Sequence, residues 1–163
     1  MARRRFASAR RAVRLRRYHR WVADTLTKDQ RSLVMSRVRS KDTVPEMRVR
    51  RVAHRMGYRY RLHRKHLPGC PDMVFPGRGA IVFVHGCFFH RHQGCALARI
   101  PKSRQDFWVP KLTRNAERDA EKVAALKALG WRVLVVWECE VSGRGWEERL
   151  RSKLAGFLDG GRA

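Results

Sequence analysis

The sequence predicts an α/β domain in which a central mixed β-sheet is flanked by helices. Two apolar runs, Ala80–Val84 and Arg132–Trp137, indicate strands buried in a sheet. A helical pattern over residues 104–129 separates them, and further helical patterns precede and follow them. The element order α-β-β-β-α-β-α is typical of a mixed sheet with helices on its faces, and active sites in such sheets favour the strand ends.

The first predicted helix begins with a capping box. Thr43 and Glu46 have the required spacing, and Pro45 stands just inside the helix start. Gly57 is expected to end the helix. Its apolar face consists of residues at helical spacing, namely Val49, Val52, Ala53 and Met56.

The remaining elements follow from alternation and turn residues. Tyr58–Leu62 alternates apolar residues with arginine, as a half-buried strand does. A turn over residues 67–71 leads into a short strand, Asp72–Phe75. The long helix carries Pro110 near its start or at a kink, and residues 145–158 form a last amphipathic helix.

The charge favours a polyanionic partner. The chain has 38 Lys and Arg against 14 Asp and Glu, a net charge of +24. Cations that neutralise phosphates release counterions, which drives nucleic-acid binding. The charge alone leaves RNA binding open. A membrane role is not expected, because no basic helix with a large apolar face and no long apolar run is found.

The distribution of charge also separates an N-terminal segment from the rest of the chain. Residues 1–23 contain nine arginines and no acidic residue, while residues 24–163 still carry +15. We interpret residues 1–23 as a basic extension, either a disordered tail or a segment ahead of the natural start, and residues 24–163 as the functional domain. Additional phosphate contact is the functional alternative for the extension. Without a secretory signal, we expect a reducing cytoplasmic compartment, where cysteines favour metal over disulfides. A monomer is the default expectation.

The densest group of reactive side chains follows the strand at residues 80–84. Cys87, His92 and Cys95 are closely spaced there, and Cys139 follows the strand at residues 132–137. Three thiolates and one imidazole would form a tetrahedral structural zinc site. The alternative is that these cysteines pack as small buried hydrophobes.

Two histidines and one aspartate near these strand ends are candidates for catalysis. His85 and His90 are not needed for zinc. Asp72 stands at the start of a short strand, at the edge of the sheet, where its carboxylate is suited to Mg²⁺. An ordinary turn aspartate is the alternative.

Two further carboxylates lie on predicted helix faces. Asp119 falls within the apolar stripe of the long helix and therefore needs a partner. A His–Asp pair would orient a general base, and a buried ion pair with an arginine is the alternative. Glu46 borders the apolar face of the first helix, where the capping box is the alternative to a catalytic role.

Phe88 and Phe89 are adjacent to the catalytic candidates. Consecutive strand residues face opposite sides, so both cannot enter one core from a strand. They are candidates for apolar wedges that enter a DNA base stack, with core packing as the alternative.

A series of motifs carries a resemblance to a known family. In order, the motifs are Arg31–Met35, Leu67–Asp72, Phe83–His90, Phe107–Trp108, Asn115–Asp119 and Gly130–Cys139. Over residues 24–140 the sequence resembles the very short patch repair (Vsr) mismatch endonucleases. This implies a variant of the restriction-endonuclease fold. It also implies an enzyme that nicks double-stranded DNA 5′ of the T in a T:G mismatch left by deamination of 5-methylcytosine, with other mismatch-repair proteins as partners.

The resemblance also assigns roles to residues. Asp72 would bind Mg²⁺ with the backbone carbonyl of Val84, while His85 and Glu46 would hold waters of the ion. His90, oriented by Asp119, would be the general base or acid at the scissile phosphate. Zinc would be bound by Cys87, His92, Cys95 and Cys139. The residues that would wedge into the duplex are Met35, Phe88 and Phe89.

The sequence departs from the family pattern at three places. Val84 stands where the family often has Thr, Phe89 stands where Trp is usual, and Gln93–Gly94 lengthens the zinc loop by one residue. Two alternatives to the mismatch nickase are therefore kept. They are a related nuclease with a different DNA target and a non-catalytic, zinc-braced nucleic-acid binder.

Overall fold

The computed structural model describes residues 27, 30, 33 and 41–160. The expected extension, residues 1–23, and the expected wedge residue Met35 lie outside these described residues. The helices and strands are α2 (Val44–Arg55), β1 (Arg61–Leu62), β2 (Met73–Phe75), β3 (Ala80–His85), α3 (Gln105–Ala128), β4 (Arg132–Trp137) and α4 (Trp146–Asp159). Short 3-10 helices lie at Pro76–Arg78, Ala96–Ala98 and Glu138–Val141. The predicted order of elements is confirmed.

The strands form one mixed sheet in the order β1-β2-β3-β4. β1 pairs antiparallel with β2, and β2 pairs antiparallel with β3. β3 pairs parallel with β4 along its whole length, from Ala80 opposite Arg132 to His85 opposite Trp137. The predicted α/β architecture with a mixed sheet is therefore confirmed, and both parallel strands end at the same edge.

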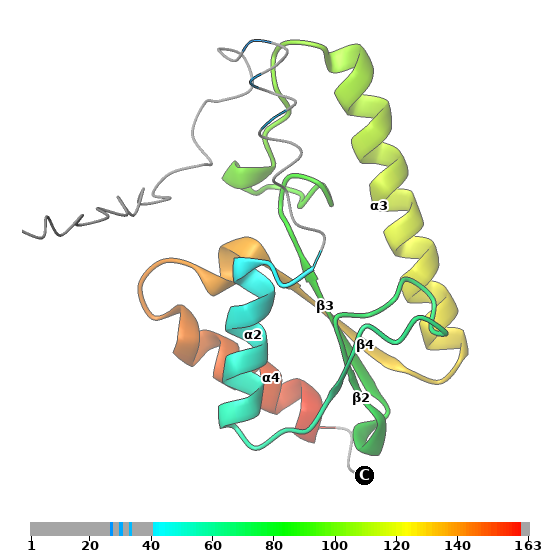
Figure 1. Cartoon of the computed structure of the whole chain (residues 1–163), viewed down its shortest axis with the longest axis vertical. Coiled ribbons are helices and arrows are strands. Elements are labelled where there is room, and N and C mark those ends of the chain that lie inside the picture. The colour runs from blue at the N-terminus through cyan, green and yellow to red at the C-terminus, as the bar shows by residue number, and fades with distance from the viewer. Residues whose placement is uncertain (1–26, 28–29, 31–32, 34–40, 161–163) are drawn as a thin grey trace, which may run out of the picture.

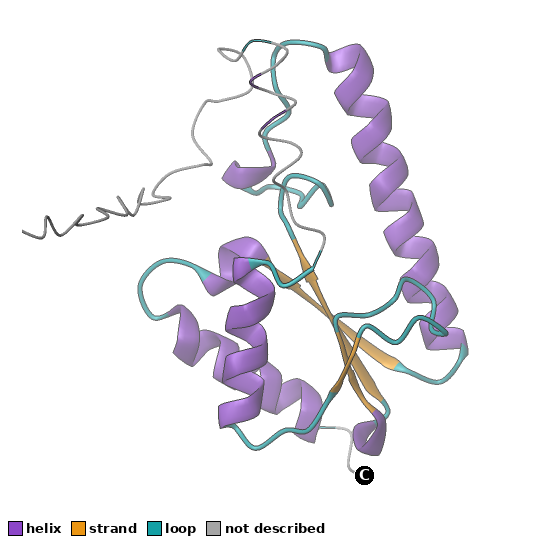
Figure 2. Cartoon of the chain, viewed as in Figure 1, coloured by secondary structure: helices purple, strands orange, loops and turns teal. Residues whose placement is uncertain are grey.

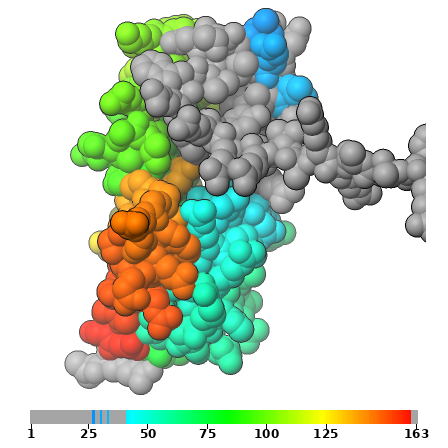
Figure 3. Space-filling view, turned by 90° about the vertical axis from the view of Figure 1, so that its left-hand side faces the viewer, coloured from blue at the N-terminus to red at the C-terminus, as the bar shows by residue number. Residues whose placement is uncertain are grey.

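Helices cover both faces of the sheet. α2 and α4 lie on one face and α3 lies on the other (Figures 1 and 2). Figure 3 shows α2 and α4 side by side, and Arg48 of α2 donates to the carbonyl of Val141 over 2.6 Å just ahead of α4. The strand residues alternate between the two layers, so that Met73, Phe75 and Val82 pack toward α2 and α4 while Ile81 and Phe83 pack toward α3.

The predicted capping box begins α2. Glu46 N donates to Thr43 Oγ1 over 3.4 Å, and Thr43 N donates to Glu46 Oε2 over 3.3 Å. Gly57, with φ of 83°, follows the C-cap Met56 as expected. The two orphan amides at the helix start are thus satisfied by side chains.

Two strand predictions need correction. Only Arg61–Leu62 of the expected strand Tyr58–Leu62 is in the sheet. Tyr58 and Tyr60 instead pack edge-on against Phe75, with ring centroids 6.4 and 5.7 Å away. β4 was expected to be fully buried, but among its residues only Val136 is, because β4 forms one edge of the described sheet. No helix of the described residues is long and apolar enough to cross a membrane.

Candidate active site and metal centre

The antiparallel pairing of β2 and β3 brings two predicted site residues together. Asp72, just before β2, lies beside the end of β3, and its Oδ2 accepts a hydrogen bond from Val84 N over 2.7 Å. A cavity of about 270 Å³ opens at this point. Its lining includes the predicted residues Asp72, Val84, His85, His90 and Asp119.

Burial controls the charge of Asp72. It raises the pKa of Asp72 to about 6, and the negative charge of Glu46 acts in the same direction, while the Val84 N–H opposes it. Asp72 Oδ1 makes no hydrogen bond with the described residues. A carboxylate oxygen with no hydrogen-bond partner among the described residues, on the wall of a polar cavity, fits a hard divalent cation such as Mg²⁺.

His90 joins the end of β3 to α3. Its Nδ1 lies 2.5 Å from Asp119 Oδ2, and its ring stacks on His85 with centroids 4.0 Å apart and an interplanar angle of 11°. Lys122, one turn beyond Asp119 on α3, approaches Asp119 Oδ1 at 3.3 Å. Asp119 therefore has the partner that its place in an apolar stripe required, and that partner is a histidine with a lysine beside it rather than an arginine.

The surroundings shift the pKa of His85 and the pKa of Asp119 downward, which leaves His85 neutral and Asp119 ionised at pH 7. Burial, with the neighbouring His90, lowers the pKa of His85 to about 4, so His85 is neutral at pH 7. Burial opposes ionisation of Asp119, but the hydrogen bond and charge of His90 and the bond from Lys122 outweigh it and lower its pKa. A neutral His85 repels no cation, and an ionised Asp119 fixes the orientation of His90.

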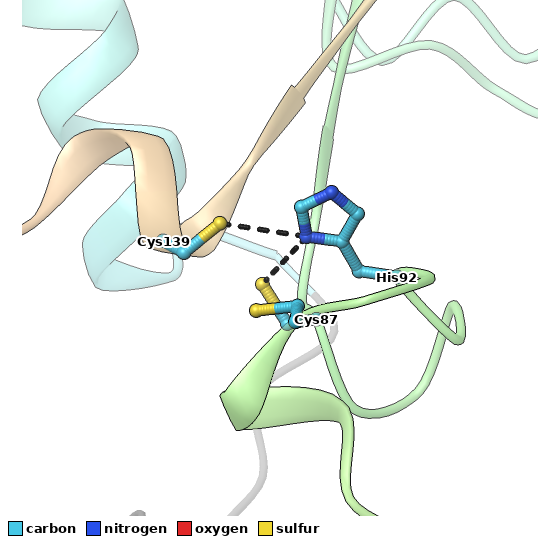
Figure 4. A group of neighbouring side chains, drawn as sticks. Cys87, His92 and Cys139 are labelled. Carbon is cyan, nitrogen blue, oxygen red and sulfur yellow. Dashed lines mark hydrogen bonds between the residues drawn. The ribbon is translucent and has the colours of Figure 1, made fainter.

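The four predicted zinc ligands meet beside this pocket. Ligand atoms of Cys87, His92, Cys95 and Cys139 all lie within 4.8 Å of one another. His92 Nδ1 is 3.6 Å from Cys87 Sγ and 3.4 Å from Cys139 Sγ (Figure 4). A tetrahedral Zn²⁺ with ordinary bond lengths separates a sulfur ligand from a nitrogen ligand by about 3.6 Å. The donor set and its spacing are compatible with zinc.

The surroundings of the thiols also suit a cation. Burial and the adjacent thiols of Cys139 and Cys95 raise the pKa of Cys87 to about 12, so without a cation the thiol stays protonated. The His92 ring stacks on Trp137 of β4, with centroids 4.1 Å apart and an interplanar angle of 3°. This stack fixes the imidazole with Nδ1 toward the sulfurs, as neighbouring groups around metal-binding histidines commonly do.

Comparison with known proteins decides the family. The family model described as DNA mismatch endonuclease Vsr matches residues 23–97. The chain is 38% identical to "DNA mismatch endonuclease Vsr" of Escherichia coli, over 85% of this chain and 90% of that protein. It is also 54% identical to "Type II nicking enzyme V.XorIIP" of Xanthomonas oryzae, over 82% of this chain and 98% of that protein. The chain belongs to the Vsr family. It is a DNA endonuclease, which sets aside the non-catalytic binder.

The two phenylalanines of the candidate zinc loop in this Vsr-family chain, Phe88 and Phe89, lie outside the core clusters of the described residues. Phe88 and Phe89 are half-buried, with ring centroids 5.1 Å apart, and neither belongs to a core cluster. Phe88 also packs edge-on against Trp108 of α3, with ring centroids 5.3 Å apart. Asn115 of α3 donates to the carbonyl of Phe89 over 3.2 Å, which anchors the loop. Among the described residues neither ring is part of a core cluster, and the role of the two rings as DNA wedges stays a prediction.

Glu46 lies behind the candidate pocket rather than on its wall. It is buried, and it is not among the described residues that line the cavity. Its Oε2 serves the capping box, while its Oε1 pairs with Arg50 and lies 3.4 Å from His63 Nε2. The two oxygens thus perform separate tasks, which sequence analysis did not anticipate.

Four polar residues at this site were not predicted from the sequence. Lys41, His63 and Lys122 line the cavity, and Arg50 lies behind it. The spacing of Glu46 and Arg50, one helical turn apart, was a readable signal for an ion pair. Lys122 follows Asp119 at the same kind of spacing. His63 carries no such signal, because its approach depends on a left-handed backbone with φ of 45°.

Proposed function

We propose that this Vsr-family endonuclease uses Mg²⁺ to nick double-stranded DNA 5′ of the T in a T:G mismatch, the product of 5-methylcytosine deamination, and so starts repair. The observation that carries the proposal is the convergence of Asp72, His85 and the His90–Asp119 pair in one cavity. Hydrolysis of a phosphodiester needs charge neutralisation, an activated water and a proton carrier, and these residues suit each task.

Each residue has a role in the proposed reaction. Asp72 and the carbonyl of Val84 would hold Mg²⁺, which supplies positive charge and water activation when bound. His85, neutral at pH 7, would orient a metal-bound water in the pocket. Glu46, behind the wall, would help to hold the hydrated ion through its charge near Asp72. His90 would transfer the proton at the scissile phosphate, while Asp119 holds its imidazole in place. Lys122 and Lys41 on the cavity wall would attract the phosphate.

The remaining residues would hold and deform the duplex. We propose that Zn²⁺ bound by Cys87, His92, Cys95 and Cys139 fixes the loop that carries His90. Phe88 and Phe89 of the same loop would enter the base stack beside the mismatch, together with Met35. Mispaired bases unstack at a lower free-energy cost than paired ones, which favours the mismatch. The mixed sheet with a catalytic aspartate at a strand end would be a variant of the restriction-endonuclease fold.

The DNA target is the part of the proposal for which the comparisons suggest a second candidate. Several relatives carry the name "Type II nicking enzyme", including those from Xanthomonas oryzae and Neisseria meningitidis. The same chemistry with a different sequence context is the second candidate. In either case we propose a monomer of the bacterial cytoplasm that acts at the nucleoid with other mismatch-repair proteins.

A strand-specific nicking assay tests the function. One labelled duplex carries T:G and its twin carries C:G, each with Mg²⁺. A cut only 5′ of the mismatched T is expected, and the Asp72→Ala variant should bind the duplex without cutting it. Equal cutting of both duplexes would instead favour the nuclease with another target, and wild-type cutting by Asp72→Ala would remove Asp72 from the site.

A further inference from the structure

The loop that joins β1 to β2 presents a basic tip beside the catalytic pocket. Arg64, Lys65 and His66 are exposed, and the loop residues before and after them, His63 and Gly69, line the cavity. In the described part of the chain, no acidic side chain forms an ion pair with Arg64 or Lys65. Within these residues the charge of the tip is not neutralised, which makes it available to an anion from outside.

Backbone hydrogen bonds and a buried side chain hold this loop in place. Leu67 N donates to the carbonyl of Arg64 and Cys70 N donates to the carbonyl of Leu67, each over 3.1 Å, so one turn follows another. The Leu67 side chain is buried in the cluster that contains Leu126 of α3. A loop that is already ordered loses little conformational entropy when it binds a ligand, which distinguishes this tip from a solvated run of charges.

A close contact with α3 connects the loop to the catalytic pair. Gly69 has φ of 76°, and a Cβ placed on it would lie only 2.8 Å from Cδ of Lys122, so the lysine stem packs directly on the glycine. Lys122 Nζ donates to Asp119 Oδ1 over 3.3 Å, and Lys122 itself lines the cavity. The positive charge of the loop tip therefore continues onto the cavity wall without a break in packing.

The helix α3 sets the distance between the catalytic pair and the loop (Figure 1). Asp119 marks the catalytic pair on this helix, and Leu126 marks the contact with the loop. At about 1.5 Å per residue these positions are about 10 Å apart along the helix axis, which is the rise of about three base pairs. Toward the other end of α3, Trp108 packs against Phe88. The catalytic pair therefore lies between the aromatic candidates for base contact and the basic tip.

We propose that Arg64 and Lys65 bind backbone phosphates of the DNA about two to four nucleotides from the cut, on the side away from the bases that Phe88 and Phe89 would enter. Two phosphate contacts on a rigid loop fix the register of the strand, so that the scissile phosphate is held at His90. The contacts themselves require only the DNA cleavage of the family. Their side relative to the mismatch rests on the proposed function.

The salt dependence of binding tests the contacts against a matched control. The loop variant combines Arg64→Gln with Lys65→Gln, and the control combines Arg51→Gln with Arg151→Gln, two exposed arginines of α2 and α4 on the other face of the sheet. Binding of the zinc-loaded full chain to a labelled duplex is measured at several salt concentrations without Mg²⁺. The slope of log K against log salt should fall by about 1.8 in the loop variant, since each lost phosphate contact removes about 0.9, and stay near the wild-type slope in the control. An unchanged slope in the loop variant, or an equal fall in both variants, would overturn the proposal.

Neutral phosphates locate the contacts on the DNA. Single methylphosphonates are scanned along both strands of the T:G duplex, on both sides of the cut. About two to four nucleotides on the 5′ side of the cut they should weaken wild-type binding roughly three- to tenfold, and they should have no further effect on the loop variant, because its contact is already lost. A loop variant that is as sensitive as wild type at every position, or shared positions on the 3′ side, would overturn the proposal. If wild type cuts no duplex at all, the proposed function fails, and the salt slopes still decide whether Arg64 and Lys65 bind the backbone.

Discussion

Replacing Asp72 by asparagine should stabilise the metal-free protein while it abolishes nicking. The asparagine side chain has nearly the shape of aspartate, and its carbonyl oxygen can still accept the hydrogen bond that Val84 N donates to Asp72. It removes a negative charge that burial and Glu46 both disfavour. It also removes the carboxylate that Mg²⁺ would need.

The size of the effect follows from the pKa of Asp72. Folding raises that pKa from 3.8 to about 6, so the folded protein holds the proton more tightly than the unfolded chain. At pH values above 6 the ionised Asp72 therefore lowers the free energy of unfolding by about 3 kcal/mol. The full difference between variant and wild type corresponds to a rise in Tm of roughly 6–12 °C for a domain of this size.

Thermal unfolding with zinc present and Mg²⁺ absent measures this difference. At pH 7.5 the Tm of Asp72→Asn should exceed that of wild type, and the gap should close as the pH falls from 6 toward 4. Adding Mg²⁺ at ten times its Kd should stabilise wild type by about 1.4 kcal/mol and leave the variant unchanged. Asp72→Ala, which leaves Val84 N without its acceptor, should gain less stability than Asp72→Asn.

An Asp72→Asn protein that is no more stable than wild type at pH 7.5 would refute the reasoning. A gap that does not change between pH 4 and pH 7.5 would refute it as well, because the effect then would not come from ionisation of Asp72.

Three further predictions concern the proton carrier, the metal centre and the basic extension. Asp119→Asn should lower kcat by about 10²–10⁴-fold, because His90 loses the carboxylate that orients it, and a wild-type rate would exclude the pair from catalysis. Elemental analysis should find one zinc per chain in wild type and clearly less in Cys139→Ser, which should also unfold at lower temperature; equal zinc in both would contradict the assignment. Deleting residues 1–21 should weaken DNA binding and flatten its salt dependence, since nine arginines lie in this region; an unchanged slope would indicate a passive tail.

Sequence patterns predicted the elements that depend on local chemistry. The Thr43–Glu46 capping box and the apolar run Ala80–Val84 act over a few residues, and the structure confirms both. The edge position of β4 was not predictable in this way, because it depends on the order of strands in the sheet. Burial of a strand is decided by its neighbours and not by its own composition.

In the candidate site, too, the residues marked by local sequence patterns were predictable and the residues placed by the fold were not. The candidate zinc ligands Cys87, His92 and Cys95 were recognisable from their types and spacing. The position of Asp119 on the apolar face of the long helix indicated a buried partner. The Arg50 network was not predicted, because Asp42 and His63 reach the guanidinium through left-handed backbone conformations, with φ of 54° and 45°. Aspartate and histidine adopt this conformation more readily than most residues, but nothing local shows where they will.

The parallel pairing of β3 with β4 affects how the chain folds. Parallel neighbours cannot be joined by a tight turn, so the whole of α3 lies between the two strands and the closing step is entropically late. Three of the four proposed zinc ligands sit in the short loop after β3, and Cys139 arrives only with the end of β4. A zinc ion bound first by the three loop ligands would gain its fourth ligand, Cys139, only when β4 pairs with β3. Refolding should therefore accelerate with zinc. The loop after β3, which carries His90, would be fixed in the same step in which β4 pairs with β3 and completes the sheet.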